Sequence, residues 1–310
     1  MKQWILDRIR KILGVPQMQW VLSEHIDCML RQNQGDMRRM RIINNILHDT
    51  QPGVSSERYT NCDVIVTLTS YGPRLYDVAF AIESIMQQTM RPNRILLWLS
   101  HDDCKRIPWA LKRQQERGLE IMECDDIKSY KKIIPALSQF PEDVLITIDD
   151  DVLYEYDIIE HLFAAYIEHP QYIHCARAHR ITLDASQHVL PYSKWTIETS
   201  AVGPHRLNFL TGVGGVLYPP HCLAPEVLSE DVFLRMAPFA DDVWLNAMAI
   251  LNGTYISRIS TRNPQGKDYL ESAAARLSPL HEINVGQHKN DEQLQAVFDY
   301  YKLYGKLTES

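Results

Sequence analysis

The stretch Val144-Leu145-Ile146-Thr147-Ile148-Asp149-Asp150-Asp151 decides the fold of this 310-residue chain. Its first five residues are mostly β-branched and predict a short strand that is buried on both faces, as in a parallel sheet covered by helices. Three carboxylates follow directly, at the end of a strand where open α/β sheets bind their ligands. The stretch therefore predicts a central strand whose carboxyl end carries a ligand site.

Strands and helices alternate on both sides of this stretch. Apolar runs predict strands, and apolar residues three or four positions apart predict helices. The expected strands are 63–69, 94–99, 119–123, 172–176, 212–218 (a glycine-led turn entering a strand) and 254–259, and the expected helices are 78–86, 109–116, 131–137, 158–167, 241–251 and 291–304. Residues 182–209 look rich in loops. Such alternation predicts an α/β fold with a mainly parallel sheet flanked by helices.

The first 55 residues are expected to form an N-terminal helical extension, and residues 56–310 the α/β domain. Gln51-Pro52-Gly53 breaks the helical pattern and places the boundary near Gly53. Three apolar stripes at helical spacing precede this break. They carry Ile5, Leu6, Ile9, Ile12 and Leu13; then Leu22, Ile26, Met29 and Leu30; and last Met37, Met40, Ile43 and Leu47.

The first stripe allows two interpretations. Such a helix commonly packs against its own domain or a partner copy, which leaves a homo-oligomer open. Because it is basic and begins with Trp4, it also fits an anionic membrane surface, where a lipid-linked substrate would lie. This second interpretation implies a peripheral contact with the inner membrane.

Composition excludes several classes of protein. The net charge of -7 and the pI near 5.9 argue against nucleic acid as a partner. No apolar run reaches the length of about 18 residues that a spanning helix needs. The N-terminus lacks the apolar core of a signal peptide, and the six cysteines form no CxxC pair. We therefore expect reduced thiols and a cytoplasmic location.

The aspartate triplet predicts a metal site. Adjacent carboxylates repel one another and raise each other's pKa unless a cation neutralises them. Oxygen ligands suit Mg²⁺ or Mn²⁺, which take one or two carboxylates together with substrate phosphates. Such an ion shields a diphosphate leaving group. A helix cap is the simpler alternative, although one aspartate would satisfy it.

The string ITIDDDVLY resembles the Asp-x-Asp motif of GT-A-fold glycosyltransferases. The resemblance extends over roughly residues 62 to 300 and includes TLTSYGPR, DIKSYKKIIPAL, TGVGGVLYPP and ADDVWLNAMA. Together these strings are similar to a bacterial glycosyltransferase family related to the large family-two group. The resemblance implies a GT-A-type, Rossmann-like sheet. It also implies metal-dependent transfer from a nucleotide-diphosphate sugar, with UDP-sugar as the expected donor, to a glycan or lipid-linked acceptor in surface polysaccharide synthesis. Inversion is the expected outcome because a candidate pair of bases exists, and retention is the alternative.

The resemblance also assigns roles within the acidic motif. The last aspartate of the motif contacts the metal, which points to Asp151. The first or middle one faces the ribose or a metal-bound water, so Asp149 and Asp150 share that role, with Asp149 as a second metal ligand. A late histidine supplies a third ligand in such enzymes, for which His288 and His281 are the candidates.

The loop after the first strand is expected to hold the nucleoside. Thr69 and Ser70 bring hydroxyls for a base or ribose, and Tyr71 brings a ring for stacking on the base. Arg74 can meet a phosphate with two parallel hydrogen bonds. The alternative is an ordinary Ser-Tyr-Gly-Pro turn with a solvated arginine.

Other candidate donor contacts lie on neighbouring segments. Asp102 and Asp103, after the second expected strand, can accept from a uracil-type base or cap a helix. The resemblance places a lysine near the diphosphate, and either Lys131 or Lys132 fits, with the other facing solvent. The glycine run from Gly212 to Gly215, and Gly214 and Gly215 in particular, lets backbone approach a ligand closely, unless the run serves only as a tight turn entering the strand.

Asp241 and Asp242 begin a predicted helix and are the candidate catalytic bases. A general base must reach the acceptor hydroxyl. The helix N-terminus lowers the pKa of such a carboxyl, and burial raises it. One aspartate would act as base while the other caps the helix or holds the acceptor; a plain capping pair is the alternative.

Two other functions compete with sugar transfer. A nucleotidyltransferase that makes an activated sugar has similar acidic sites, but it normally carries a Gly-rich basic loop after the first strand, which TSYGPR matches poorly. A non-catalytic nucleotide-sugar binding protein would bind donor without needing the Asp241-Asp242 pair.

Overall fold

The computed structural model of the chain describes residues 35–263, 266–271 and 289–308. The chain divides into two compact units, Met1–Asn45 and Ile46–Ser310. The helical stretches expected within residues 1–34 lie outside the described residues, as does His288. The expected boundary at residue 55 stays a prediction.

The helix over residues 35–48 buries a different face from the one that the sequence predicts. Its predicted apolar stripe is exposed, whereas Ile42 and Ile46 are buried. The exposed residues are Met37, Met40, Ile43 and Leu47. Both stripes follow the helical period, so periodicity alone does not decide which one is covered.

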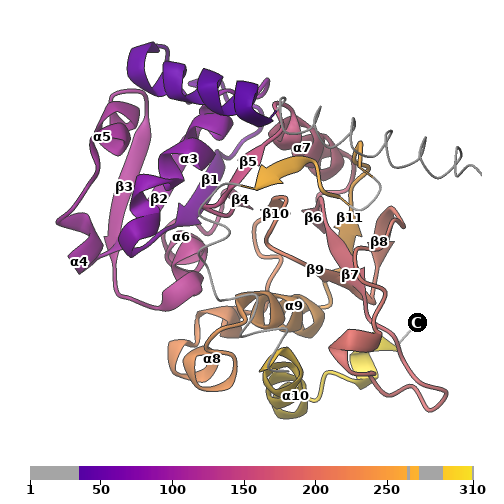
Figure 1. Cartoon of the computed structure of the whole chain (residues 1–310). Coiled ribbons are helices and arrows are strands. Elements are labelled where there is room, and N and C mark those ends of the chain that lie inside the picture. Colours follow the sequence, from indigo (N-terminus) through magenta and orange to yellow (C-terminus); the bar gives the residue numbers. More distant parts are fainter. Residues whose placement is uncertain (1–34, 264–265, 272–288, 309–310) are drawn as a thin grey trace, which may run out of the picture. The chain divides into compact units, whose positions relative to one another are not determined.

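An eight-stranded sheet forms the centre of the second unit, in the order β3-β2-β1-β4-β10-β6-β11-β8 (Figure 1). Its strands are β1 (Val64–Thr69), β2 (Arg94–Ser100), β3 (Leu119–Cys124), β4 (Val144–Thr147), β6 (Ile173–Cys175), β8 (Gly203–His205), β10 (Val216–Tyr218) and β11 (Ile256–Arg258). The first four strands in this order are parallel, β11 is parallel to β6, and β10 and β8 run antiparallel to their neighbours. This confirms the predicted α/β class with a mainly parallel sheet.

Helices flank this sheet, and two small strand pairs extend it. The α-helices are α3 (Val78–Met86), α4 (His101–Cys104), α5 (Trp109–Gln115), α6 (Ile134–Gln139), α7 (Ile158–Glu168), α8 (Glu230–Met236), α9 (Asp241–Asn252) and α10 (Lys289–Tyr301). Short 3-10 turns are η1 (Gly72–Tyr76), η2 (Lys128–Lys132), η3 (Tyr192–Lys194), η4 (Pro225–Leu228) and η7 (Gly305–Leu307). The small pairs join β5 (Val152–Tyr154) to β12 (Tyr269–Glu271), and β7 (Ala178–Arg180) to β9 (Asn208–Leu210), all antiparallel.

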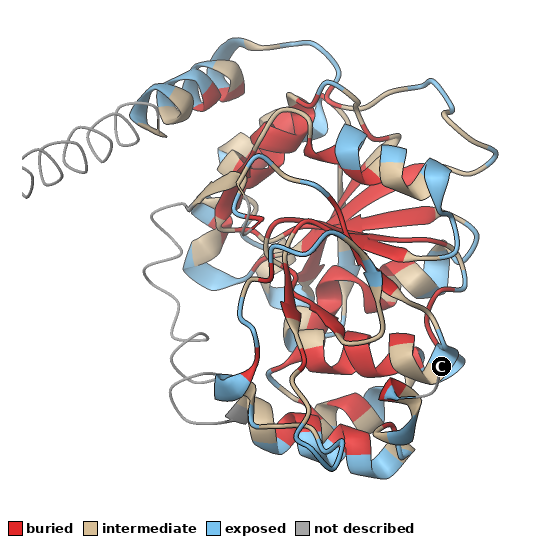
Figure 2. Cartoon of the chain, turned by 90° about the vertical axis from the view of Figure 1, so that its right-hand side faces the viewer, coloured by how far each residue is buried: buried red, intermediate tan, exposed pale blue. Residues whose placement is uncertain are grey.

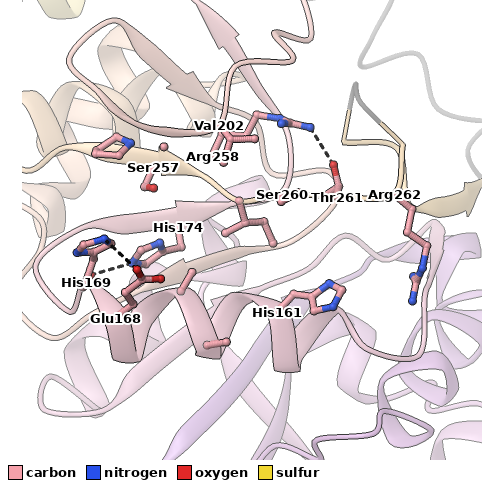
Figure 3. A pocket seen from close by; sticks show the side chains of 15 residues that line it. His161, Glu168, His169, His174, Val202, Ser257, Arg258, Ser260, Thr261 and Arg262 are labelled. Carbon is pink, nitrogen blue, oxygen red and sulfur yellow. Dashed lines mark hydrogen bonds and ion pairs between the residues drawn. The ribbon is translucent and has the colours of Figure 1, made fainter.

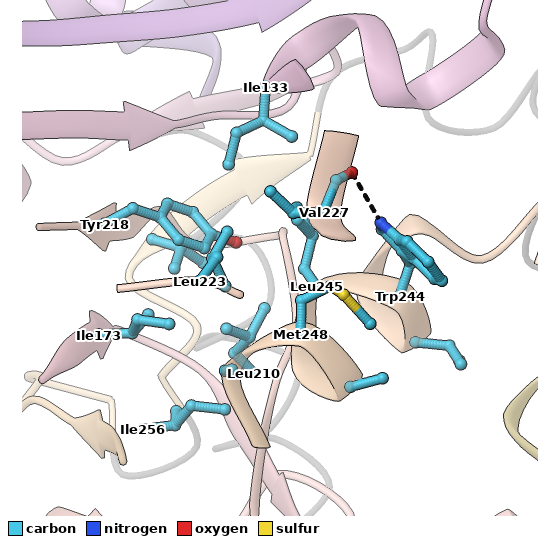
Figure 4. Close-up of a cluster of buried hydrophobic side chains, with 14 of the residues drawn as sticks. Ile133, Ile173, Leu210, Tyr218, Leu223, Val227, Trp244, Leu245, Met248 and Ile256 are labelled. Atoms are coloured by element: carbon cyan, nitrogen blue, oxygen red, sulfur yellow. Dashed lines mark hydrogen bonds between the residues drawn. The ribbon is translucent and has the colours of Figure 1, made fainter. Parts of the chain in front are cut away.

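The core lies between the sheet and its helices. Figure 2 shows the central strands buried among helices that turn exposed faces outward. β1 and β4 are apolar on both faces because helices cover both sides of the sheet. Below the sheet, Tyr218 of β10 and Leu210 of β9 lie close to Leu245 and Met248 of α9 (Figure 4).

The antiparallel direction of β10 positions the functional residues. Val216 pairs with Thr147, so the start of β10 meets the carboxyl end of β4. The glycine turn before β10 therefore lies at the same sheet edge as the aspartate triplet. A parallel strand in this place would carry the turn at the opposite edge.

The last helix braces two segments around this edge. Gln293 Oε1 of α10 accepts a hydrogen bond from the Phe239 amide at 3.0 Å, just before α9. Asp291 Oδ1 accepts one from the Tyr192 amide at 2.6 Å, at the start of η3. α10 thus holds both the entry to α9 and a turn that lies about 100 residues earlier in the chain.

Within the described residues, every helix is too short or too polar to cross a bilayer.

Candidate functional site

Four segments meet at the carboxyl edge of the central strands. β1 and β4 run side by side, with Thr67 opposite Thr147, and the Ile148 amide donates to Thr67 O at 3.2 Å. The aspartate triplet follows at once. The glycine turn before β10 and the first turn of α9 complete the edge. The sequence prediction that the aspartates lie at this edge is confirmed.

The middle aspartate is tied into the fold. Ser70 Oγ donates to Asp150 Oδ2 at 2.7 Å, and Arg74 Nε donates to the same oxygen at 3.0 Å. A second Arg74 nitrogen contacts Asp150 Oδ1, which makes the pair bidentate. Asp150 is only 8% exposed, and this burial raises the pKa of its carboxyl, while Arg74 lowers it. Asp150 therefore orients Ser70 and Arg74 and has little freedom to hold anything else.

Arg74 joins two of the aspartates. Its Nη2 lies 2.8 Å from Asp151 Oδ2 in addition to its bonds with Asp150. Its side chain is 12% exposed, so the alternative of a solvated arginine is wrong. An arginine held by two carboxylates still presents its remaining N–H groups along the rim of the site.

Lys132 joins the triplet to α9. Its Nζ lies 3.3 Å from Asp149 Oδ1 and 2.8 Å from Asp241 Oδ2. Burial alone would lower the pKa of Lys132, but the carboxylates of Asp149, Asp241 and Asp242 outweigh it and hold that pKa well above its usual value. The ammonium stays charged and fixes the two acidic segments at one distance from each other.

Lys131 points elsewhere, although it is the next residue in the chain. Its Nζ pairs with Asp126, outside the acidic cluster, and its side chain is 3% exposed. The expectation that one of the two lysines faces solvent is wrong, because both are buried. The 3-10 turn η2 rotates successive side chains by about 120°, which separates their partners.

The two aspartates that begin α9 have different hydrogen-bond partners. Ser129 Oγ donates to Asp241 Oδ1 at 2.9 Å, so Asp241 belongs to the network of Lys132 and Ser129. Asp242 accepts from the Gly212 amide with both oxygens, at 3.1 and 3.2 Å. Neither carboxylate caps α9, whose N-cap residue is Ala240 without a side-chain bond. The capping-pair alternative is therefore wrong.

The pKa of the Asp242 carboxyl is well above its ordinary value. Burial, with a further contribution from Asp241 and Asp149, raises the pKa of Asp242 to about 7, against the opposing effects of Lys132 and the Gly212 amide. A carboxyl with this pKa exchanges protons near neutral pH, as a general base requires. Asp241 and Asp149 instead lie against the Lys132 ammonium. Burial also raises the pKa of Asp149.

Within the glycine run, Gly212 and not Gly214 or Gly215 lies against the charged groups. A Cβ on Gly212 would lie 2.8 Å from Lys132 Nζ, 3.3 Å from Asp242 Oδ1 and 3.5 Å from Asp149 Oδ1. These three groups converge on the space that the missing side chain leaves. The signal was present in the string TGVGGVLY, whose first glycine is the one that faces the charged groups.

Gly214 and Gly215 serve the turn. Both have positive φ, near 100°, and the side chains they lack would face Gly266 O and Leu162 respectively. Their neighbours are not the acidic residues. The alternative of a tight turn entering the strand describes their local structure.

The predicted nucleoside loop is partly committed to the fold. Thr69 Oγ1 donates to Trp98 O at 2.8 Å, and Asp103 Oδ1 accepts from the Gly72 amide at 3.0 Å. Asp103 thereby fixes the start of η1. Tyr71 is 45% exposed, and the Arg74 guanidinium carbon lies 5.8 Å from its ring centroid. Tyr71 retains a free face on which a base can stack.

The residues present fit a divalent cation only together with a substrate. Within the described ranges, no three Asp, Glu, His or Cys side chains converge as a ligand set. Asp149 and Asp151 remain 27% and 21% exposed at the side chain, whereas Asp150 is occupied. Two carboxylates suit Mg²⁺ or Mn²⁺ that completes its shell with phosphate oxygens and water.

Charge favours a cation at this edge. Five carboxylates, those of Asp149, Asp150, Asp151, Asp241 and Asp242, face two cations, Arg74 and Lys132. The excess negative charge raises the pKa of Asp149, together with its burial, and persists even when Asp242 is protonated.

A pocket of about 690 Å³ lies away from these residues, between α7 and the strands β6 and β11 (Figure 3). His174 Nε2 donates to His169 O at 2.9 Å on its wall, and Arg258 Nη2 donates to Thr261 Oγ1 at 2.8 Å. None of the predicted site residues that the structure describes lines this pocket. The pocket and the acidic cluster are therefore separate places on the molecule.

No protein-family model matches the chain, and no curated protein matches its sequence. Its fold is similar to solved structures at low identity. S. aureus TarS 1-349 in complex with UDP is 15% identical, with a TM-score of 0.44 over 64% of this chain and 58% of that chain. S. aureus TarS 1-349 is 17% identical, with a TM-score of 0.45 over 77% and 72%. CMP:2-keto-3-deoxy-manno-octonic acid synthetase complexed with CTP is 12% identical, with a TM-score of 0.37 over 70% and 96%.

The chain thus spans less than two thirds of the first of these structures. The chemistry of the site follows from its own residues.

Proposed function

We propose that this protein is a glycosyltransferase that moves a sugar from a nucleotide-diphosphate donor, with UDP-sugar as the expected donor, to a hydroxyl of a glycan or lipid-linked acceptor. The observation that carries the proposal is Asp242: a carboxyl with a pKa near 7, held by the Gly212 amide opposite the aspartates that end β4. This arrangement supplies a proton acceptor on one side and a strongly acidic edge on the other.

Asp242 is the base in this proposal. It takes the proton of the acceptor hydroxyl as the oxygen attacks the anomeric carbon, and the bond from that carbon to the diphosphate oxygen breaks. The nucleoside diphosphate leaves from the opposite face of the sugar, so the configuration inverts. Asp241 pairs with Lys132 and positions the first turn of α9.

Asp151 and Asp149 are the residues that would hold Mn²⁺ or Mg²⁺ together with the diphosphate. The ion would offset the charge that develops on the leaving group. Arg74 and Lys132 hold these two carboxylates at the rim of the site, and Tyr71 offers its ring to the base. Surface polysaccharide synthesis is the biological setting that the sequence resemblance suggests for such an enzyme.

Nucleotidyl transfer and donor binding without turnover remain the rival functions. A base with a pKa near 7 favours sugar transfer over nucleotidyl transfer to a sugar phosphate, because attack by a hydroxyl requires proton removal, whereas attack by a phosphate oxygen does not.

The products separate the three functions. The test incubates the full chain with a panel of nucleotide sugars, an acceptor panel and Mn²⁺, and measures nucleoside diphosphate and pyrophosphate. Sugar transfer releases nucleoside diphosphate, nucleotidyl transfer from a nucleoside triphosphate releases pyrophosphate, and simple binding releases neither.

Matched variants locate the activity. Asp242→Asn should abolish nucleoside diphosphate release, and Asp231→Asn should leave it unchanged, because Asp231 is exposed on α8. Unchanged release in Asp242→Asn would refute the assignment of the base.

A further inference from the structure

A second charged cluster lies beside the glycine turn. Arg177 follows β6, and its Nη2 lies 2.8 Å from Glu198 Oε1. Lys267 Nζ lies 2.9 Å from the same oxygen. Two cations therefore share one carboxylate oxygen, which leaves a net charge of about +1 next to an otherwise strongly acidic site.

Arg177 is fixed to the residue that precedes Gly212. Its Nη1 donates to Thr211 Oγ1 at 3.0 Å, and the Thr211 amide donates back to Arg177 O at 3.3 Å. The next residue is Gly212, whose amide holds Asp242. Within the part of the chain that the structure describes, the Nε of Arg177 is buried without a hydrogen-bond partner, and such an unsatisfied donor is unfavourable unless a ligand completes it.

Glu198 is held in a strained conformation. Its φ is 53°, in the left-handed region that non-glycine residues rarely adopt. The Glu198 amide donates to His179 Nδ1 at 2.9 Å, so the imidazole must be neutral there. Strain of this kind costs on the order of 1 kcal/mol and is concentrated at ligand sites. The fold thus maintains the carboxylate between the two cations.

Gly266 brings Lys267 to this cluster. A Cβ on Gly266 would lie 2.3 Å from Ala176 O, and its φ is +75°, so only glycine fits against the backbone that precedes Arg177. Asp268 secures the same loop, because its carboxylate accepts from the Arg262 and Asn263 amides at 2.7 and 2.6 Å. The loop leads into β12, which pairs with β5 directly after the aspartate triplet.

We propose that Arg177 and Lys267 form a subsite for an anionic group, a phosphate or carboxylate, carried by the acceptor. This proposal rests on the proposed function, because it takes Asp242 as the base that touches the acceptor hydroxyl. Arg177 reaches Asp242 through Thr211 and Gly212, whereas the expected donor side is lined by Arg74 and Lys132. Glu198 holds the two cations in place until the anion binds.

The chemistry explains why an acidic site needs this pair. An acceptor that carries a negative group is repelled by the carboxylates at the end of β4. A guanidinium binds phosphate or carboxylate with two parallel bonds, and an adjacent ammonium adds attraction. Neutral acceptors would gain nothing from either residue.

The test measures binding without turnover, on the full chain at low salt. The probes are glycerol 3-phosphate, glycerol and UDP, each titrated by calorimetry. The wild type should bind glycerol 3-phosphate in preference to glycerol. Arg177→Gln should weaken glycerol 3-phosphate about 10- to 100-fold, the range of a charge-assisted hydrogen bond, and leave UDP unchanged.

Two further variants keep the test decisive if Arg177→Gln unfolds. Lys267→Gln changes a side chain that is 47% exposed, so the fold should tolerate it, and it should weaken glycerol 3-phosphate as well. Glu198→Gln removes the competing carboxylate and should tighten the same probe. Melting temperatures of all variants check folding.

The opposite results overturn the proposal. Equal binding of glycerol 3-phosphate by the wild type, Lys267→Gln and Glu198→Gln would show that no anion subsite exists here. Weakened UDP with unchanged glycerol 3-phosphate would assign the cations to the donor. Because the titration needs no sugar transfer, a failure of the proposed function leaves this result readable, and transfer to a neutral acceptor would survive a failure of the subsite.

Discussion

The ammonium of Lys132 lies 2.8 Å from Asp241 Oδ2, and this contact joins the turn η2 to the first turn of α9. The same ammonium lies 3.3 Å from Asp149 Oδ1. One buried cation therefore sets the separation between the end of β4 and the residues that begin α9. The site depends on this charge more than on any single aspartate.

Replacement of Lys132 should be far more damaging than replacement of Lys131. Lys132→Met leaves buried carboxylates without their cation, which should lower the free energy of unfolding by about 3–5 kcal/mol. Lys131→Met breaks a pair whose partner, Asp126, is 67% exposed. That change should cost only about 1 kcal/mol or less. Urea denaturation of both variants measures the difference, and equal losses would contradict the role of Lys132.

The pH dependence of turnover should follow Asp242. Its folded pKa of about 7 lies above the ordinary value of 3.8, and the base must be deprotonated to act. We expect kcat/KM to rise with pH through about 7. Asp242→Asn should lose about 10²- to 10⁴-fold in rate and the ascending limb with it.

The same shift has a defined effect on stability. The folded state binds the Asp242 proton more tightly than the unfolded state, so this contribution is complete below pH 3.8 and is lost as the pH rises through about 7. Thermal unfolding of Asp242→Asn, compared with the wild type across that window, should show the difference shrinking towards acid pH. The assignment of Asp242 as the catalytic base has its own check. A kcat/KM that does not change between pH 6 and 8, about one unit either side of the midpoint, would contradict it.

Gly212→Ala should disturb the site and spare the fold. The added methyl would lie 2.8 Å from Lys132 Nζ and push the ammonium from its two carboxylates. A displacement of this size should reduce turnover about 100-fold. Gly305→Ala is the matched control, because nothing lies within 4 Å of its added methyl. Circular dichroism and initial rates compare the two, and normal rates in Gly212→Ala would argue that the cluster tolerates rearrangement.

Removal of divalent cations should show that the three adjacent aspartates have different roles. Chelation is expected to stop turnover, and added Mn²⁺ to restore it. Asp151→Asn should raise the Mn²⁺ concentration that half-restores activity, because Asp151 is partly exposed at the rim. Asp150→Asn should lower the melting temperature instead, since it leaves Arg74 without its main buried partner. Full activity in the presence of chelator would exclude the metal.

Acid should weaken the fold through His179. Burial, with help from Arg177, lowers the pKa of His179 to about 4, below its ordinary value of 6.5. The stability that the neutral imidazole contributes is complete above pH 6.5 and falls as the pH drops towards about 4. His179→Asn, which keeps an acceptor for the Glu198 amide, should make the melting temperature less dependent on pH in this window. An unchanged pH dependence would place the titration at another group.

The sequence predicts the framework well because the framework is local. The strand before the aspartates, the helix over 78–86 and the helix that begins at Asp241 all follow from runs of apolar residues, and each appears within a few residues of its expected bounds. Packing of both faces of β1 and β4 also follows from their β-branched composition.

Side-chain contacts between residues that are far apart in the chain cannot be predicted from local apolar patterns. Nothing in Lys131-Lys132 distinguishes the two side chains, because a 3-10 turn and not an α-helix decides their directions. Arg74 lies about 76 residues from Asp150, and only the fold brings them together. Trp195 and Trp244 are both buried in the core, and Trp244 Nε1 donates to Val227 O at 3.1 Å, 17 residues away in the chain (Figure 4).

The C-terminal helix α10 holds two segments that border the proposed site. α10 supplies Gln293 to the Phe239 amide and Asp291 to the Tyr192 amide, so it ties down the approach to Asp241 and the turn that leads into the anion subsite. A shortened version of the protein that stops before Lys289 would keep every residue of the proposed chemistry and lose the anchors that hold two of its segments. Because α10 also contributes Leu294, Val297 and Phe298 to the core, trimming this tail for expression or crystallisation should destabilise the fold as well as release these two segments.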